Sequence, residues 1–341
     1  MTNPYDAILI VSFGGPEKRD DVIPFLQNVL RGRNVPRRRM QEVAAHYDRF
    51  DGVSPINEQV RELMRKLRDE LDRHGIDLPL FWGNRNWHPL LPDTLQQMKE
   101  AGVRRALAVV LSAYSSYSGC RQYLDDVEQA RAAVGAGAPV VDKVRAFFNH
   151  PQFVAANADN FRQAIAQFDP SQQETVHVIF TAHSIPVSMA ANCEYAAQLT
   201  ETCRLIAEEE RGLLPERWEL AYQSRSGRPT DPWLEPDISD ALTAAAGRGV
   251  ENVVVMPVGF LSDHLEILYD LDVEAREVAE KLGVHMVRAT SVGTHPRFVS
   301  MLRELIQERT TANAERRSVG RLPPLPDVCP HDCCPLLRAR H

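Results

Sequence analysis

The residues of this sequence that could carry chemistry most directly are a histidine and a row of carboxylates. His183 follows an apolar run, residues 175–181, that is rich in β-branched side chains. Further along the chain, Glu266, Asp270 and Glu274 are spaced four residues apart, which on a helix places them on one side. A neutral imidazole can accept protons, and carboxylates can bind a divalent metal ion. The two groups together indicate a site that handles protons, a metal ion or both.

Each group also has a simpler interpretation. A histidine near the end of a strand is more often structural than catalytic, and an acidic row is often a solvated helix face. Like charges one helical turn apart destabilise a helix by roughly a few tenths of a kcal/mol per pair unless a cation or protons neutralise them. A helix is expected over residues 264–281, and Asp263 and His264 stand at its start beside Glu266, which favours a site over a solvated face. We call Glu266, Asp270 and Glu274 the acidic stripe.

The apolar pattern predicts the elements that would position these side chains. Predicted strands alternate with helical segments, which indicates parallel βαβ units in an α/β fold. The predicted strands are residues 7–13, 79–84, 105–112 and 140–147 in one half, and 175–181, 218–223, 251–258 and 284–290 in the other. We therefore expect two Rossmann-like domains, each with a four-stranded parallel sheet flanked by helices, and a ligand cleft between them. The end of the strand before His183 is where such sheets bind ligands.

The expected domains follow this doubling, with boundaries at 1–150, 151–312 and a Cys-rich tail at 313–341. With 44% hydrophobic and 25% charged residues, the chain of 341 residues is typical of a soluble globular protein. Its net charge of -7 argues against a nucleic-acid partner. No apolar run is long enough to span a membrane, and no basic leader precedes the first one. We therefore expect a cytoplasmic protein, and we expect it to be a monomer.

Five separated segments of the chain resemble the ferrochelatases, the enzymes that insert ferrous iron into a porphyrin. In chain order they are SFGGPE (12–17), GVSPIN (52–57), FTAHSIP (180–186), YQSRSGRPTDPWLEP (222–236) and PVGFLSDHLEILYDLD (257–272). The resemblance runs from about residue 5 to residue 310, and the sequences of these segments are most similar to those of the soluble actinobacterial type. It implies a chelatase fold with the porphyrin in the cleft between the two domains.

The resemblance also implies roles for the histidine and the acids. Metal insertion requires two pyrrole protons to leave while ferrous iron arrives, so the site needs a base and anionic oxygen ligands. By resemblance, His183 accepts protons and contacts the substrate iron, and Glu266 is its partner across the pocket. Asp270 and Glu274 are implied to form a relay for protons or metal.

Further residues are implied to contact the porphyrin. Phe13 is expected at the porphyrin face, Arg31 is expected to pair with a propionate, and Ser54 and Tyr123 are expected to donate hydrogen bonds. The place of Ser54 directly before Pro55 also predicts that Ser54 caps the helix that follows. Residues 31–39, which we call the basic segment, stand where membrane-associated ferrochelatases carry an apolar lip, although a solvated basic face would look the same. Arginine pairs with carboxylates through charge-assisted bonds, so the basic segment suits a porphyrin with several propionates.

Coproporphyrin III is therefore the expected substrate, with coproheme as the product in heme biosynthesis. Protoporphyrin IX is the alternative substrate, and a non-catalytic carrier of tetrapyrrole or metal is the alternative of another class. A histidine beside an acidic stripe favours the enzyme, because a carrier needs neither a base nor an ion path.

The tail adds a second group of possible metal ligands. Cys329, Cys333 and Cys334 form a C-x3-C-C pattern, and Cys120 stands in a polar loop in the middle of the chain. Some ferrochelatases hold a 2Fe-2S cluster with three C-terminal cysteines and one from that loop, so the resemblance implies that these four thiols bind such a cluster.

Structural zinc, with His331 in place of one thiol, is the alternative for this group. Without a metal, the Pro-rich tail would be a disordered end, because its composition excludes a core helix. Cys193 and Cys203 are expected to be ordinary buried or half-buried thiols on a helix.

Overall fold

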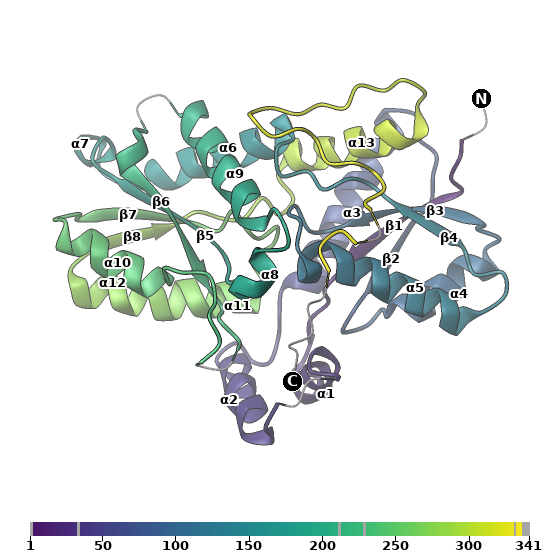
Figure 1. The fold of residues 1–341 in the computed structure, drawn as a ribbon, viewed down its shortest axis with the longest axis horizontal. Coiled ribbons are helices and arrows are strands. Elements are labelled where there is room, and N and C mark those ends of the chain that lie inside the picture. Colours follow the sequence, from purple (N-terminus) through teal and green to yellow (C-terminus); the bar gives the residue numbers. More distant parts are fainter. Residues whose placement is uncertain (1–2, 33–34, 211–212, 228–229, 331, 336–341) are drawn as a thin grey trace. The chain divides into compact units, whose positions relative to one another are not determined.

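The computed structural model describes residues 3–32, 35–210, 213–227, 230–330 and 332–335. The chain divides into two compact units, and the described residues of each build one four-stranded parallel sheet (Figure 1). Unit 1 comprises Met1–Leu111, Gln122–Val144 and Leu302–Glu315, and unit 2 comprises Ser112–Arg121, Arg145–Met301 and Arg316–His341. The expected fold class, two parallel sheets flanked by helices, is confirmed.

The sheet of unit 1 has the order β2-β1-β3-β4. Its strands are β1 (Ala7–Ser12), β2 (Leu80–Asn84), β3 (Arg105–Val110) and β4 (Val140–Lys143). Its helices are α1 (Val22–Val29), α2 (Arg37–Asp48), α3 (Ile56–Arg73), α4 (Leu91–Glu100) and α5 (Gln122–Val134). Every residue of β1 is buried, as expected for a central parallel strand covered on both faces.

The sheet of unit 2 has the order β6-β5-β7-β8. Its strands are β5 (His177–His183), β6 (Trp218–Gln223), β7 (Asn252–Met256) and β8 (His285–Arg288). Its helices are α6 (Pro151–Ile165), α7 (Pro170–Gln173), α8 (Val187–Ala190), α9 (Tyr195–Glu209), α10 (Ile238–Gly247), α11 (Leu265–Tyr269), a π-helix (Asp270–Ala275) and α12 (Arg276–Leu282). In Figure 1, α6 and α9 cover one face of this sheet, and α10 and α12 cover the other.

We expected the chain to divide once at residue 150 and once at residue 312, but each unit is built from three separate segments. The loop after β3 packs with unit 2, because the Tyr114 hydroxyl donates to the Val258 carbonyl (2.9 Å) and the Ser115 amide donates to Gln198 Oε1 (2.8 Å). The last helix, α13 (Pro296–Thr310), begins in unit 2 and ends in unit 1. Its carboxyl end is held in unit 1 by Arg309, which donates to the Lys143 carbonyl (2.8 Å).

The tail is ordered by hydrogen bonds to unit 2 over residues 317–322, so a disordered end is the wrong description of this stretch. Asn149 accepts from the Val319 amide (2.9 Å) and donates to the Leu322 carbonyl (2.7 Å). The buried Arg145 donates to the Arg317 carbonyl (2.7 Å). Of the helices in the described ranges, none is long and apolar enough to cross a membrane.

Candidate active site

His183 is the last residue of β5, in register with Gln223 of β6. We expected the strand to end before it, but the ladder continues because the Ser184 amide donates to the Gln223 carbonyl (2.8 Å). His183 Nδ1 lies 2.5 Å from the Ser184 carbonyl oxygen, which fits a proton on Nδ1. Nε2 is then left as a proton acceptor.

The acceptor nitrogen of His183 faces a carboxylate. Nε2 lies 3.6 Å from Oε1 of Glu266, in the first turn of α11. The two side chains are 34% and 43% exposed, so both can be reached by a substrate. They come together because β5 and β7 are neighbours in a parallel sheet, and α11 follows the carboxyl end of β7.

A second imidazole, His264, stands directly before α11. Its ring packs edge-on against Phe260, with ring centroids 5.1 Å apart. Burial lowers the pKa of His264, the charge of Glu266 opposes that shift, and the nearby His183 adds to it. The sequence pattern assigns His264 no role, and its lowered pKa favours a neutral imidazole beside the pair.

Asp270 is the second member of the acidic stripe and lies deeper than the other two. Its Oδ2 accepts a hydrogen bond from the Ser224 hydroxyl. Burial raises the pKa of Asp270 to about 8, and the charges of Glu266 and Glu274 contribute to the rise. Asp270 therefore holds a proton at neutral pH, whereas Glu274 is exposed.

The acidic stripe does not lie on a regular α-helix. We expected one helix over residues 264–281, but Asp270–Ala275 form a π-helix between α11 and α12. Single turns of this kind inside α-helices are frequent at functional sites. The π-helix places Asp270 at its start and Glu274 near its end.

Sequence reasoning missed two residues of the site, the last residue of β6 and the residue that follows it. Ser224, which binds Asp270, has a φ of 62°, a left-handed conformation that costs a non-glycine residue about 1–2 kcal/mol. Gln223, the last residue of β6, is 1% exposed and its amide lies beside the Asp270 carboxyl. The only sequence signal was their place in the segment 222–236, because a positive φ at serine leaves no pattern.

We expect Asp270→Asn to stabilise the protein increasingly as the pH rises from about 4 to about 8. In the unfolded chain this carboxyl ionises near its ordinary pKa of 3.8, whereas the folded protein retains the proton to about pH 8. The folded state therefore binds more protons across this range, so the free energy of unfolding falls with pH by at most about 1.4 kcal/mol per pH unit. Asparagine removes that dependence.

Urea denaturation of both proteins across this pH range measures the difference. Asp240→Asn, at an exposed position of α10 outside the acidic stripe, is the matched control and should follow wild type. A difference between Asp270→Asn and wild type that stays constant with pH would contradict the assignment of a buried, protonated carboxyl.

The residues expected to contact the porphyrin lie in unit 1, and two of them are joined by an arginine. The Arg85 guanidinium lies over the ring of the buried Tyr123 (4.6 Å) and near that of Phe13 (5.8 Å). Arg85 Nε is 2.5 Å from Oδ2 of Asp126, whose pKa is raised by burial. Phe13 is 36% exposed. Sequence reasoning missed Arg85 because its partners lie far away in the chain.

The other two residues of this group are not joined to them by these contacts. Ser54 is buried against Gly15, where an added Cβ would lie 2.8 Å from the Ser54 Cβ. It does not cap a helix as we expected, since α3 begins at Ile56 without a side-chain cap. Arg31 is exposed and donates to Asn28 Oδ1 (2.6 Å).

The cysteines gather in part. The sulfur atoms of Cys333 and Cys334 lie 3.6 Å apart. Burial raises the pKa of Cys334 to about 12, and the thiols of Cys333, Cys193 and Cys329 contribute. Cys193, which we expected to be an ordinary thiol, is thus close to the tail cysteines, whereas Cys203 is fully buried as expected.

A complete metal site is not formed by the described residues. Within the ranges that the structure describes, no group of three or more His, Cys, Asp or Glu side chains is arranged to hold a metal ion. Cys120 lies on a π-helix, Tyr117–Arg121, in the loop that packs with unit 2. His331, the alternative ligand, lies outside the described residues.

Comparison with solved structures shows which known fold the chain shares. SirB from Bacillus subtilis with Fe3+ superimposes with a TM-score of 0.54 and 12% identity, covering 92% of this chain and 98% of that chain. At this identity the likeness shows the fold alone, which is that of a chelatase.

The family follows from the sequence comparisons. The ferrochelatase family model matches residues 5–310, and the chain belongs to the ferrochelatase family, whose members are metal chelatases. The ferrochelatase of Rhodopirellula baltica is 54% identical over 332 residues, covering 97% of this chain and 93% of that protein. The coproporphyrin III ferrochelatase of Streptomyces coelicolor is 46% identical over 354 residues, with 98% and 94% covered, and that of Nocardia farcinica is 48% identical over 320 residues, with 92% and 90% covered. The family resemblance of the five segments is confirmed.

Proposed function

We propose that this enzyme inserts ferrous iron into coproporphyrin III at His183 and Glu266. The observation that carries the proposal is the 3.6 Å approach of an acceptor imidazole nitrogen to a carboxylate, both partly exposed, at the carboxyl ends of neighbouring parallel strands. Relatives that are 46% and 48% identical and carry the name coproporphyrin III ferrochelatase support the choice of porphyrin. We include the cytoplasmic location and the monomeric state in this proposal.

The proposed chemistry divides between a base and a relay. His183 Nε2 accepts a pyrrole proton as the iron approaches the ring nitrogens, and Glu266 stabilises the imidazolium that forms. A second pyrrole proton must also leave, and the acidic stripe provides its path. Asp270 is protonated at neutral pH, so it can pass a proton to the exposed Glu274 when it receives another from the side of Glu266. Carboxylate oxygens also suit the incoming divalent iron.

The proposed porphyrin contacts lie in unit 1. Phe13 presents aromatic surface to the macrocycle, and Tyr123 donates a hydrogen bond in this proposal, with Arg85 and Asp126 fixing its ring. Ser54 contributes a hydroxyl in this proposal. Arg31 pairs with a propionate from its exposed position at the start of the basic segment.

The basic segment explains a preference for the more acidic porphyrin. Coproporphyrin III carries propionates where protoporphyrin IX carries two vinyl groups. Arg37, Arg38 and Arg39 of this segment are exposed, and Arg38 and Arg39 share Glu42 (both 3.2 Å). A hydrogen bond to a charged group contributes about 1.5–3 kcal/mol, so one well-paired propionate shifts the preference by about tenfold or more.

We expect wild type to use coproporphyrin III more efficiently than protoporphyrin IX, and Arg31→Leu to raise the KM for coproporphyrin about tenfold while changing that for protoporphyrin less. Anaerobic assays with ferrous iron and each porphyrin measure both quantities. Arg65→Leu is the matched control, because it removes an exposed guanidinium of α3, outside the basic segment, that is paired with Glu62. Equal or better turnover of protoporphyrin by wild type would overturn the choice of substrate.

We also propose that Cys120, Cys329, Cys333 and Cys334 hold a 2Fe-2S cluster. Two thiolates bound at about 2.3 Å to one tetrahedral metal ion would lie about 3.8 Å apart, close to the 3.6 Å between Cys333 and Cys334. The high pKa of Cys334 means that metal binding must displace its proton. Such a cluster would supply a covalent link between the tail and the loop that contains Cys120.

Purified protein should therefore contain iron and acid-labile sulfide in equal amounts, and Cys120→Ser should lose both, as should Cys333→Ser. Cys203→Ser, at a buried thiol of α9, is the control that should retain them. Stoichiometric zinc without sulfide would favour the structural zinc site instead.

A further inference from the structure

Arg288 lies at the centre of a half-buried ionic group near the candidate active site. It is the last residue of β8, and its side chain is only 12% exposed. Its Nε and terminal nitrogen donate to the two carboxylate oxygens of Asp272, at 2.6 and 3.0 Å. Its other terminal nitrogen donates to Oδ1 of Asp263 at 3.1 Å. Burial alone would lower the pKa of Arg288, but Asp272 and Asp263 raise it, so the group is an ionised guanidinium held by two carboxylates.

The two carboxylates flank the segment that carries the proposed chemistry. Asp263 directly precedes His264 and stands three residues before Glu266. Asp272 lies in the π-helix, two residues after Asp270. One guanidinium therefore fixes both the start of α11 and the π-helix that follows it.

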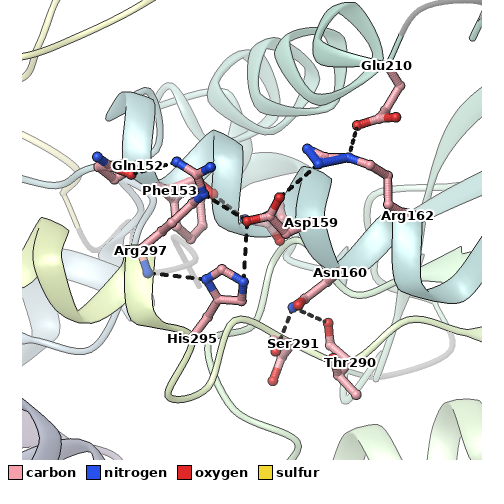
Figure 2. Close-up of polar contacts among 11 residues, drawn as sticks. Gln152, Phe153, Asp159, Asn160, Arg162, Glu210, Thr290, Ser291, His295 and Arg297 are labelled. Carbon is pink, nitrogen blue, oxygen red and sulfur yellow. Dashed lines mark hydrogen bonds and ion pairs between the residues drawn. The ribbon is translucent and has the colours of Figure 1, made fainter.

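Asp263 is also hydrogen-bonded to the loop that follows β8. Oδ1 of Asp263 also accepts from the Ser291 amide, at 3.1 Å. The carbonyls of Thr290 and Ser291 accept from Asn160 Nδ2 of α6, at 2.9 and 3.0 Å, as Figure 2 shows. The loop after β8 is thus tied to α6, and Asp263 is tied to that loop.

A second group of ion pairs, around Asp159, also ties the loop after β8 to α6. Asp159 of α6 accepts from Arg162 (2.8 Å) and Arg297 (2.8 Å), and its Oδ2 lies 3.4 Å from His295 Nε2 (Figure 2). His295 and Arg297 stand where the loop after β8 enters α13. The loop that holds Asp263 is therefore bonded to α6 at both of its ends.

We propose that Arg288 is a positioning residue for iron insertion, which holds Asp263 and Asp272 so that Glu266 stays opposed to His183 and Asp270 stays inside the protein. The inference rests on the proposed roles of Glu266 and Asp270. The backbone bonds of a π-helix run from i to i−5, so this turn interrupts the regular pattern of α11 and α12, and the bonds from Arg288 to Asp272 hold it through side chains as well. A planar guanidinium suits this task because it binds two oxygens of one carboxylate in a fixed direction.

The test combines kinetics with amide hydrogen exchange. Arg288→Met should lower kcat about 100-fold, because a misplacement of about 1 Å has effects of that size, and should leave the KM for porphyrin within about threefold. Exchange should accelerate about tenfold or more in residues 263–275 and remain unchanged in β5 and β6. Arg288→Lys should recover part of kcat, since an ammonium group can satisfy one carboxylate but not both.

Arg276 offers a matched control. Its guanidinium lies 4.0 Å from the same Asp272 carboxylate, but its side chain is 46% exposed. Arg276→Met should stay within about threefold of wild type in kcat, with unchanged exchange. Equal effects of the two substitutions, or a normal kcat in Arg288→Met, would overturn the proposal.

Two further variants keep the test decisive if Arg288→Met fails to fold. Asp272→Asn and Asp263→Asn retain the arginine and should each accelerate exchange in residues 263–275 and lower kcat. Normal kcat in both would again overturn the proposal. Full activity in Glu266→Gln with faster exchange in Arg288→Met would instead count against the proposed role of Glu266, so the two failures are distinguishable.

Discussion

Replacing His183 by alanine is expected to lower kcat for iron insertion at least about 1,000-fold while the affinity for porphyrin stays within about threefold. The His183 ring presents Nε2 toward Glu266, with Nδ1 fixed against the Ser184 carbonyl. His264, the second imidazole beside this pair, does not occupy that place, because its ring is packed against Phe260 at the start of α11. Single-turnover assays under anaerobic conditions, with porphyrin binding followed by fluorescence quenching, separate the chemical step from binding.

Two controls make this result specific. His285→Ala removes an exposed imidazole of β8 that packs on Phe168 and should leave kcat unchanged. Added imidazole should restore part of the activity of His183→Ala, since the missing group is a base. Near-normal turnover of the alanine variant, or a loss of porphyrin binding that accounts for the whole effect, would show that His183 is not the proton acceptor.

Glu266→Gln is expected to lower kcat about 100-fold, whereas Glu274→Gln should change it less than about fivefold. Glutamine has the shape of glutamate but no charge, so it can neither stabilise the His183 imidazolium nor bind iron as a carboxylate. Glu266 faces His183 directly, whereas Glu274 is exposed at the far end of the π-helix. Steady-state rates of both variants at saturating porphyrin and varied iron give the comparison.

Asp240→Asn shows how far kcat changes when a carboxylate elsewhere is removed, because Asp240 lies on α10 outside the acidic stripe. A double variant of Glu266 and Glu274 should be no slower than Glu266→Gln alone if the second residue only passes protons onward. Equal damage from the two single substitutions would mean that the stripe acts as one unit, and our division of roles between its members would be wrong.

The fold was predictable because its signals are local. Every predicted strand is present, with ends displaced by a few residues, since a parallel strand buried on both faces reads as a short apolar run. The approach of His183 to Glu266 was also within reach of the sequence. Both residues follow apolar runs, and the carboxyl ends of neighbouring parallel strands meet at one edge of a sheet.

The remaining features of the site depend on contacts between distant residues. The spacing of the acidic stripe is the same whether the segment is α-helical or contains a π-helix, so the sequence could not distinguish them. The bond from Arg288 to Asp272 joins β8 to a helix that precedes it in the chain. Ser54 looked like a helix cap, but its burial against Gly15 is set by tertiary packing.

The course of α13 has a consequence for synthesis of the protein on the ribosome. Leu302–Glu315 belong to unit 1, where Arg303 lies 3.3 Å from the buried Glu70 and Arg309 donates to the Tyr5 hydroxyl (2.7 Å). Unit 1 contains β1, yet these partners emerge only after residues 145–301 of unit 2 have been made. Nascent domains ordinarily fold from the amino end as they appear. A fragment that stops at residue 150 therefore lacks the part of α13 that belongs to unit 1.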